Sequence, residues 1–274
     1  MFNPLFCPKE KRCNFKLKKL TIEHIKNLKN NTHTFATLTA YDYISAQIID
    51  AANIPLILVG DSASMMIYGY DTTIPISMDE IILITKAVSR GAQRSLVVAD
   101  MPFLSYQTSV EDAVQNAGIL IKDGGAGAVK IEGGKQVSKH TQTLVNYGIP
   151  VLGHVGLTPQ SFHQLSGYKI QGKTFEDAQK IIDDAKAVED SGAFAVVLEC
   201  IPQDLAEDIT GQLMIPTIGI GSGKKCDGQI QVFHDVIGLS KETPPKHAQT
   251  YDNMYVKISS IIGQYKADVE GTNG

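Results

Sequence analysis

Short apolar runs recur along the chain, and a segment with apolar residues at helical spacing follows most of them. The clearest run is Leu56–Val59, which lies between Pro55 and Gly60 and contains no polar residue. A run this short and this uniformly apolar is typical of a strand that is buried on both faces of a parallel sheet. The pattern predicts eight strands, at 35–40, 56–60, 96–102, 128–133, 150–156, 195–199, 216–222 and 229–235.

Apolar positions three and four residues apart predict helices between these strands. The expected helices span 21–30, 46–52, 78–90, 110–123, 136–147, 174–191, 202–212 and 252–265. Two further links, 63–77 and 157–173, are polar and long for connections within one domain. Long loops of this kind are often functional.

Strands alternating with helices in this way predict a (β/α)8 TIM barrel, an α/β fold in which helices cover the outside and side chains fill the interior. Such a barrel needs roughly 250 residues, and the chain has 274. The alternative is an open doubly wound sheet, which usually carries a glycine-rich turn after its first strand. Here residues 41–43 are Tyr-Asp-Tyr, which favours the barrel.

The predicted elements also indicate how the chain is organised. We expect a single barrel domain over residues 21–266 that begins with a short N-terminal helix. Residues 1–20 hold six Lys or Arg and one Glu without a long apolar core, which is unlike a secretory signal and predicts a flexible basic extension. The polar residues 267–274 are expected to form a disordered tail.

Composition and charge exclude several classes of protein. The net charge is −4 and the mean hydropathy is −0.04, so we expect no nucleic-acid partner and no polybasic membrane contact. No apolar run approaches the roughly 20 residues that a membrane helix needs. The cysteines match no zinc-ligand spacing, and we expect reduced thiols in a cytoplasmic protein. They are Cys7, Cys13, Cys200 and Cys226.

Charged and polar side chains stand where the predicted strands end, and in a (β/α)8 barrel the functional groups lie at the carboxyl ends of the strands. The residues at these ends are Asp61, Ser62, Asp100, Lys130, Glu132, His154, Glu199 and Ser222. Acidic residues are seldom buried, so several of them at one end of a barrel indicate a shared cation. Carboxylate oxygens without a Cys/His set suit Mg²⁺ or Mn²⁺ rather than zinc.

Each of these residues also has a simpler structural interpretation. A single Asp at a strand end often caps the next helix, and His154 alone is typical of a hydrogen-bonded wall residue. Lys130 could serve as a counter-ion to Glu132, and residues 219–223 only weakly resemble a phosphate-binding turn. Glu199 differs, because it follows an apolar strand directly and precedes more apolar sequence. A carboxylate in such surroundings suits a general base.

Several blocks of sequence resemble the ketopantoate hydroxymethyltransferase family, and they occur in order from about residue 17 to residue 239. The blocks are Gly60–Ser62, Gly69–Pro75, Val98–Phe103, Val129–Gly134, Gly153–Gln160, Val197–Pro202 and Cys226–Gln229. Two departures are small: Ser222 stands where Ala is common, and Leu104 stands where Gly is common. The first sixteen residues and the segment after about Lys246 match no motif.

The resemblance implies a barrel of the phosphoenolpyruvate/pyruvate superfamily that transfers a hydroxymethyl group from 5,10-methylenetetrahydrofolate to 3-methyl-2-oxobutanoate. The product would be 2-dehydropantoate, in pantothenate biosynthesis. The family also implies a homo-oligomer, commonly a decamer. By motif position, Asp61, Asp100 and Glu132 would hold Mg²⁺, and Glu199 would accept the proton. The 2-oxoacid would contact Asp61, Ser62, Asp100 and Lys130. The pocket wall would include His154 and Ser222.

Two other functions remain as alternatives. A carbon–carbon lyase or mutase of the same superfamily would also act on a 2-oxoacid, but such enzymes place a reactive Cys in a mobile loop rich in Lys and Gly. This chain has no such loop, and Cys200 directly follows Glu199. A barrel retained only as a scaffold should have lost part of the acidic set, and all four carboxylates are present.

Overall fold

The computed structural model describes residues 18–29, 31–165 and 167–271. Most of the predicted basic extension, residues 1–17, and the end of the predicted tail, residues 272–274, lie outside the described part of the chain. The expectations of flexibility and disorder there stay predictions.

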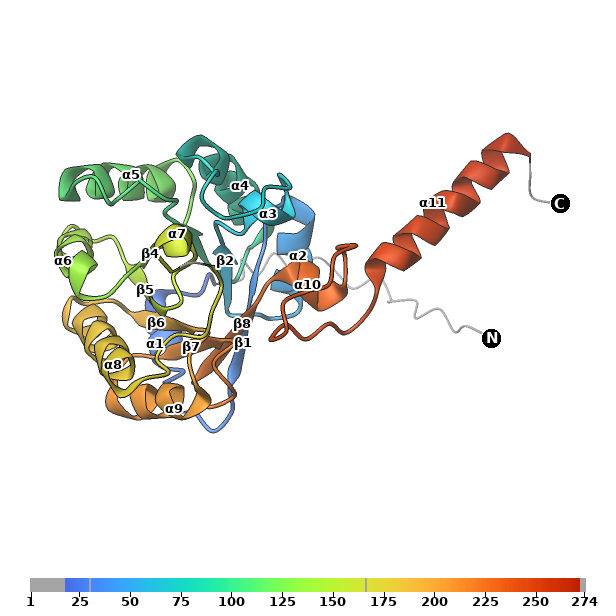
Figure 1. Ribbon diagram of the computed structural model, residues 1–274. Helices are drawn as coiled ribbons and strands as arrows, with labels where there is room; N and C mark the ends of the chain where they lie inside the picture. The colour runs from blue at the N-terminus through green and yellow to red at the C-terminus, as the bar shows by residue number, and fades with distance from the viewer. Residues whose placement is uncertain (1–17, 30, 166, 272–274) are drawn as a thin grey trace.

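Eight parallel strands form a closed barrel, so the predicted (β/α)8 fold is confirmed (Figure 1). Each strand pairs with the next, and β1 also pairs with β8 to close the ring. The strands are β1 (Phe35–Thr39), β2 (Leu56–Val59), β3 (Leu96–Asp100), β4 (Ala128–Glu132), β5 (Val151–Gly156), β6 (Ala195–Glu199), β7 (Thr217–Ile220) and β8 (Gly228–Gln231).

Helices surround the barrel, and side chains cap the N-termini of four of the covering helices. The main covering helices are α2 (Tyr43–Ala51), α4 (Met78–Gly91), α5 (Val110–Lys122), α6 (Ser138–Asn146), α8 (Phe175–Asp190) and α9 (Gln203–Gln212). Asp42, Ser77, Ser109 and Thr174 each accept a backbone N–H of the helix that follows, which satisfies donors that have no partner within the helix.

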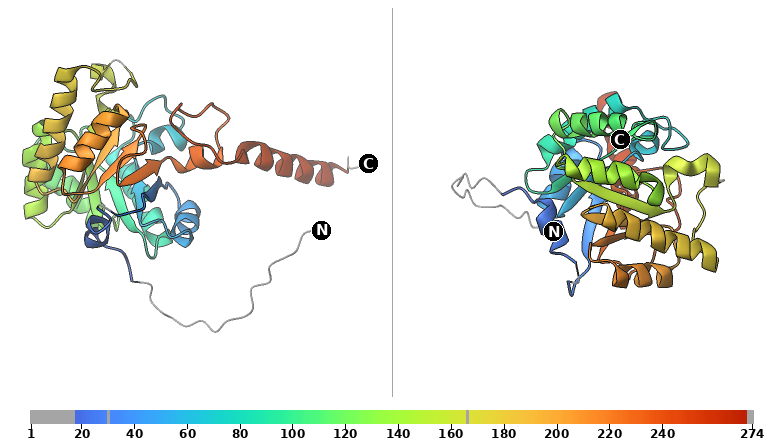
Figure 2. Two further views of the ribbon diagram at one scale, coloured as in Figure 1. Left: turned by 90° about the horizontal axis from the view of Figure 1, so that it is seen from below. Right: turned by 90° about the vertical axis from the view of Figure 1, so that its left-hand side faces the viewer.

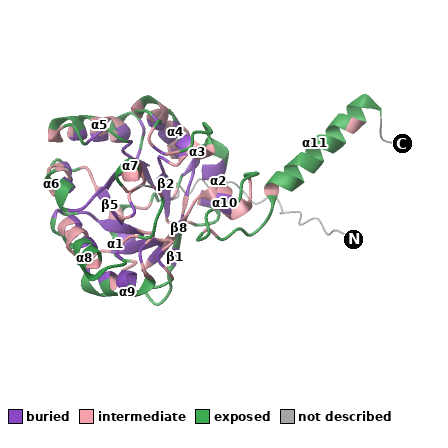
Figure 3. Ribbon diagram, viewed as in Figure 1, coloured by how far each residue is buried: buried purple, intermediate pink, exposed green. Residues whose placement is uncertain are grey.

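The strands β2 and β3 are buried on both faces, as their apolar sequences predict (Figure 3). On β2, Leu56 and Leu58 pack with residues inside the barrel, whereas Ile57 and Val59 pack against the surrounding helices. The alternation follows from the two-residue period of a strand. It also fixes which of the polar residues at the strand ends point inward.

The short N-terminal helix α1 (Ile22–Lys26) covers the end of the barrel where the strands begin. Ile25 is fully buried in the same apolar cluster as Leu56 and the first residues of several other strands. Just after α1, the Lys29 amine donates to Asp227 Oδ2 at 3.0 Å and to the Thr210 carbonyl at 2.7 Å. The N-terminal end of the barrel is thereby closed, and the C-terminal end is left for the polar residues.

The two long links contain short helices that their sequences do not reveal. After β2 comes α3 (Ala63–Met66), and after β5 come η2 (Pro159–Ser161) and α7 (Phe162–Leu165). The 3-10 turn η1 (Lys135–Val137) precedes α6.

The prediction for the last strand was too long at its C-terminal end. The strand β8 stops at Gln231, and Phe233 begins the helix α10 (Phe233–Ile237). The run from 229 to 235 is apolar at positions that suit either a strand or a helix, and the backbone bond from Asp235 N to Val232 O selects the helical turn.

The last helix, α11 (Met254–Glu270), extends away from the barrel and runs into the segment predicted to be a disordered tail (Figures 1 and 2). None of its side chains is buried, although several are large and apolar (Figure 3). Among the exposed ones are Tyr255, Val256, Ile258, Ile261, Ile262, Tyr265 and Val269. No helix in the described residues is both long and apolar enough to cross a membrane.

Candidate active site

A cavity of about 610 Å³ opens at the C-terminal end of the barrel. Its walls come from the ends of the strands, from the link after β5, and from a segment at 240–248 that no sequence motif indicated. All the predicted site residues except Ser222 line this cavity. Charged groups are seldom buried, and their concentration here distinguishes the cavity from the other described parts of the chain.

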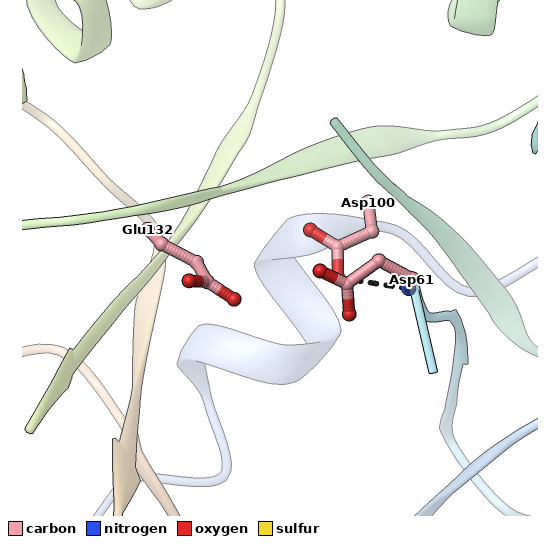
Figure 4. A group of neighbouring side chains, drawn as sticks. All are labelled: Asp61, Asp100 and Glu132. Atoms are coloured by element: carbon pink, nitrogen blue, oxygen red, sulfur yellow. Dashed lines mark hydrogen bonds between the residues drawn. The ribbon is translucent and has the colours of Figure 1, made fainter. Parts of the chain in front are cut away.

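Three carboxylates meet in the wall of this cavity (Figure 4). Asp61 follows β2, Asp100 ends β3 and Glu132 ends β4, so three neighbouring strands deliver them to the same end of the barrel. One oxygen from each lies within 4.8 Å of the others, and the exposed fractions of the three residues are 4%, 1% and 5%. The backbone N–H of Asp61 donates to Asp100 Oδ2 at 3.2 Å. Neither Asp61 nor Asp100 caps a helix; Ser62 and Ser109 occupy those positions.

Lys130 contacts two of the three carboxylates in this acidic group. Its Nζ donates to Asp100 Oδ2 at 2.6 Å and to Glu132 Oε1 at 3.4 Å, and its side chain is 4% exposed. Lys130 and Glu132 lie two residues apart on β4 and therefore point the same way, while Lys130 pairs in register with Asp100 on β3. The shorter contact makes Lys130 primarily the partner of Asp100, rather than of Glu132 alone.

The acidic group carries more negative charge than Lys130 can balance. Burial raises the pKa of Asp61 well above its ordinary value, and the charges of Asp100 and Glu132 raise it further. Burial also raises the pKa of Asp100, although Lys130 opposes the shift. Glu132 differs: burial raises its pKa, but Lys130 and His154 hold the pKa of its carboxyl below the usual range.

The donor set fits a hard divalent cation. Asp100 Oδ1 is buried and accepts no hydrogen bond from the described residues, so one oxygen of the acidic group has no partner in the protein. Buried polar atoms are rarely left in this state unless an ion or water completes them. Mg²⁺ commonly binds through one or two carboxylates and keeps its other positions for water and substrate.

Glu199 stands apart from the acidic group, and His154 lies between them. The His154 Nδ1 is 3.5 Å from Glu132 Oε1, and its Nε2 is 3.3 Å from Glu199 Oε2. Burial and the charge of Lys130 lower the pKa of His154, but the two carboxylates outweigh them and raise it to about 9. The Glu199 side chain is 15% exposed, against 2% for that of Glu132, so Glu199 is the more accessible carboxylate from the cavity.

Ser62 lines the cavity and is held by a residue that the sequence analysis did not single out. Its hydroxyl lies 2.7 Å from the phenolic oxygen of Tyr41, which follows β1 and is 3% exposed. Burial raises the pKa of Tyr41, so this phenol stays protonated. The Tyr-Asp-Tyr sequence after the first strand argued against a glycine-rich turn, and it could also have indicated that Tyr41 lies at the site.

Ser222 differs from the expectation, because it faces away from the cavity. Its hydroxyl donates to the Leu198 carbonyl at 2.7 Å and accepts the N–H of Ile201 at 3.3 Å, which ties the end of β6 to the turn after β7. Gly221 lines the cavity in its place. Leu104, the other departure from the family pattern, has φ = 67°, a left-handed conformation that favours glycine.

Gln160 and Tyr106 were missed altogether. Both are buried and both hydrogen-bond to the acidic residues or to their backbone. Gln160 lies in a matched sequence block, but the chain around it reads only as a polar loop. The segment 240–248 was missed because its sequence carries no apolar period and no shared motif.

Comparisons with known proteins agree with this architecture. The chain is 51% identical over 249 residues to the 3-methyl-2-oxobutanoate hydroxymethyltransferase of Dehalococcoides mccartyi (strain CBDB1), covering 91% of this chain and 89% of that protein. It is 51% identical over 253 residues to the enzyme of the same name from Geobacter metallireducens, covering 92% of this chain and 95% of the relative.

Two solved structures with similar folds have far lower sequence identity and bear on the fold alone. The phosphoenolpyruvate phosphomutase of Streptomyces platensis subsp. rosaceus superposes with a TM-score of 0.62 at 11% identity, covering 92% of this chain and 88% of that one. A 2,3-dimethylmalate lyase superposes with a TM-score of 0.56 at 15% identity, covering 91% and 98%.

A family model described as ketopantoate hydroxymethyltransferase matches residues 19–273, which is nearly the whole chain. This match includes every strand of the barrel and all of the acidic residues that line the cavity. It also favours hydroxymethyl transfer over the lyase or mutase alternative. The chain therefore belongs to the ketopantoate hydroxymethyltransferase family.

Proposed function

We propose that this protein transfers a hydroxymethyl group from 5,10-methylenetetrahydrofolate to 3-methyl-2-oxobutanoate, giving 2-dehydropantoate for pantothenate biosynthesis. Its family and the shared name of its relatives support this reaction. The observation that carries most weight is the separation of two acidic functions in one cavity: a buried group of three carboxylates, and Glu199 beyond His154. The reaction needs both a site for negative charge on oxygen and an independent base.

In this proposal Asp61, Asp100 and Glu132 hold Mg²⁺. The excess negative charge around Lys130 and the unpartnered Asp100 Oδ1 support a cation there. When bound, Mg²⁺ supplies a Lewis acid that polarises the keto group of the 2-oxoacid and stabilises negative charge on its oxygen.

Glu199 is proposed as the general base. It removes the proton from C3 of 3-methyl-2-oxobutanoate, and the electron pair left on C3 forms the new bond to the one-carbon unit of the folate. Both bonds from that carbon to the folate nitrogens N5 and N10 break, and water supplies the hydroxyl group. The proton taken by Glu199 and the remaining proton of the water go to the two nitrogens, which gives tetrahydrofolate. A carboxylate that does not bind the cation suits this role, since it keeps its basicity for the proton.

Other residues of the cavity would orient the substrate. The buried Lys130 amine places positive charge beside the oxygen that becomes negative, which is the kind of fixed electrostatic stabilisation that lowers such barriers. The Ser62 hydroxyl, held by Tyr41, is available to the carboxylate of the 2-oxoacid. Asp61 and Asp100 would also contact the 2-oxoacid, because they lie in the cavity that would bind it.

The size of the cavity supports a second, larger substrate. Its volume of about 610 Å³ falls within the range of roughly 300–1,000 Å³ that encloses drug-sized ligands. A five-carbon acid needs much less, which leaves room for part of a folate. The segment 240–248 lies on the wall of this space.

We also propose a homo-oligomer, with a decamer as the family resemblance implies. The exposed apolar side chains of α11, such as Ile258, Ile261 and Ile262, support association with other subunits. The mass of the protein in solution, measured by light scattering, tests this: several subunits are expected, and a monomer at micromolar concentration would contradict it.

The free thiols of Cys200 and Cys226 support the cytoplasm as the location of the protein.

The reaction is tested most simply by product formation. Purified protein given 3-methyl-2-oxobutanoate, 5,10-methylenetetrahydrofolate and Mg²⁺ should form 2-dehydropantoate, and EDTA should stop it. Product in EDTA would contradict the metal role. Cleavage or isomerisation of the 2-oxoacid without the folate would instead support the lyase or mutase alternative.

A further inference from the structure

One uncharged residue reaches two of the three carboxylates at once. Gln160 belongs to the turn η2 that follows β5, and it is 4% exposed. Its side-chain Nε2 donates to Asp61 Oδ2 at 3.1 Å, and its backbone N–H donates to Glu132 Oε2 at 3.0 Å. The Asp61 carboxylate accepts a hydrogen bond from Gln160. The Asp100 and Glu132 carboxylates instead contact Lys130.

The orientation of the Gln160 amide is fixed by its other partners. Nε2 also donates to the Met101 carbonyl at 2.9 Å. On the opposite side, Oε1 accepts from the Tyr106 hydroxyl at 2.9 Å and from Gln107 Nε2 at 3.1 Å. A reversed amide would place Oε1 against a carboxylate and a carbonyl, neither of which can donate.

Tyr106 connects this amide to the strand that carries Glu132. It is 1% exposed, and its phenolic oxygen accepts the backbone N–H of Glu132 at 3.1 Å. Tyr106 follows β3, Gln160 follows β5 and Glu132 ends β4, so the connection spans three neighbouring strands. The three groups are held together without any added charge.

We propose that Gln160, oriented by Tyr106, is the positioning residue of the divalent-cation site: it fixes the Asp61 and Glu132 carboxylates in the arrangement that binds the ion. The inference rests on the proposed role of these carboxylates in holding Mg²⁺. An amide suits the task because it donates to Asp61 without neutralising it. A Lys at this position would compete with the ion, and a Glu would add a fourth negative charge with no proton to donate.

The decisive experiment measures Mg²⁺ binding by calorimetry on the full-length protein without substrate. Gln160→Met keeps the length and burial of the side chain but removes the amide. Loss of a residue that orients metal ligands typically weakens affinity by about 10- to 100-fold, and we expect the Kd for Mg²⁺ to rise by about 10-fold or more. The matched control is Gln179→Met on the exposed face of α8, where Nε2 donates to Asp183 at 2.9 Å away from the cavity; its Kd should equal that of the unaltered protein.

Tyr106→Phe provides a second variant that keeps the Gln160 amide and removes only the hydroxyl that orients it. We expect a smaller rise in the Kd for Mg²⁺, about threefold, which is below the 10- to 100-fold range because the amide itself is retained. In both variants, raising Mg²⁺ to saturation should restore most of kcat, with little change in the KM for the 2-oxoacid. A purely structural role would not respond to added Mg²⁺ in this way.

The outcomes separate this inference from the proposed function. If the unaltered protein binds Mg²⁺ and both variants bind it equally well, Gln160 has no positioning role and the proposed reaction stands. If the unaltered protein binds no Mg²⁺, the metal site itself is contradicted, and the inference with it. If Gln160→Met does not fold, an unchanged Kd in Tyr106→Phe still overturns the inference, and a raised Kd supports it.

Discussion

At the N-terminal end of the barrel, the buried Asp227 carboxylate is matched by a cation and by donors. Asp227 Oδ2 accepts from Lys29 at 3.0 Å and from the backbone N–H of Thr217 at 2.8 Å. At the C-terminal end, three carboxylates lie together, Lys130 contacts two of them, and Asp100 Oδ1 has no hydrogen-bond donor among the described residues. A buried ion pair with matched charges stabilises the fold or leaves its stability unchanged. A buried group with excess negative charge is completed by a bound cation.

The two ends therefore predict opposite consequences for removing a charge. At the N-terminal end, a lost charge should reduce stability and leave chemistry intact. At the C-terminal end, a lost charge should abolish chemistry and have less effect on folding.

Asp100→Asn should give the largest change. It keeps the shape of the side chain but removes a proposed ligand of the cation, and we expect product formation at ordinary Mg²⁺ to fall by about 10³-fold. The measurement is the initial rate of 2-dehydropantoate formation, with circular dichroism to confirm folding. Asp208→Asn, an exposed change on α9, is the control and should leave the rate unchanged. Retention of metal-dependent turnover by Asp100→Asn would remove this residue from the cation site.

Lys29→Met should act on stability. Breaking a buried ion pair leaves an uncompensated charge and costs about 3 kcal/mol, so the midpoint of urea unfolding should fall while kcat of the folded enzyme is retained. The control is Lys225→Met, because Lys225 pairs with Glu207 at 3.2 Å with both side chains about half exposed. Exposed pairs contribute roughly 0–1 kcal/mol. Equal effects of the two substitutions would mean that burial of the Lys29 pair carries no special weight.

His154 should make a smaller, pH-dependent contribution. Because Glu132 and Glu199 raise its pKa to about 9, above the unfolded value of about 6.5, its stabilising effect is fully present below pH 6.5 and is lost as the pH rises through about 9. The urea midpoint should decline over this window, and His154→Gln should flatten the decline. His163→Gln, at an exposed position, should keep the slope of the unaltered protein. If the urea midpoint of His154→Gln still declines with pH as steeply as that of the unaltered protein, the pH dependence arises from another titrating group.

Much of the barrel and of its acidic residues could be predicted from the sequence, because both depend on local patterns. A short apolar run ending in a carboxylate, as at Leu56–Asp61 or Leu96–Asp100, places that carboxylate at a strand end whatever lies around it. The strands are parallel, so their ends gather at one side of the barrel.

The features that the sequence did not predict depend on contacts between residues distant in the chain. Gly221 and Ser222 are adjacent, yet one lines the cavity and the other faces away, which a sequence pattern cannot distinguish. The amide of Gln160 acquires its role only when the turn after β5 folds back onto Asp61 and Glu132. The length of α11 was also underestimated, because its C-terminal residues are polar and read as a tail.

The separate roles of Glu199 and the three carboxylates can be measured through exchange of the C3 hydrogen of 3-methyl-2-oxobutanoate for deuterium, followed by NMR with Mg²⁺ and without the folate. The unaltered protein should catalyse the exchange, and EDTA should prevent it. Glu199→Gln should still bind Mg²⁺ and the 2-oxoacid, yet its exchange should slow by about 10²- to 10⁴-fold. Exchange at the unaltered rate in Glu199→Gln, or in EDTA, would contradict the division of work between Glu199 and the three carboxylates.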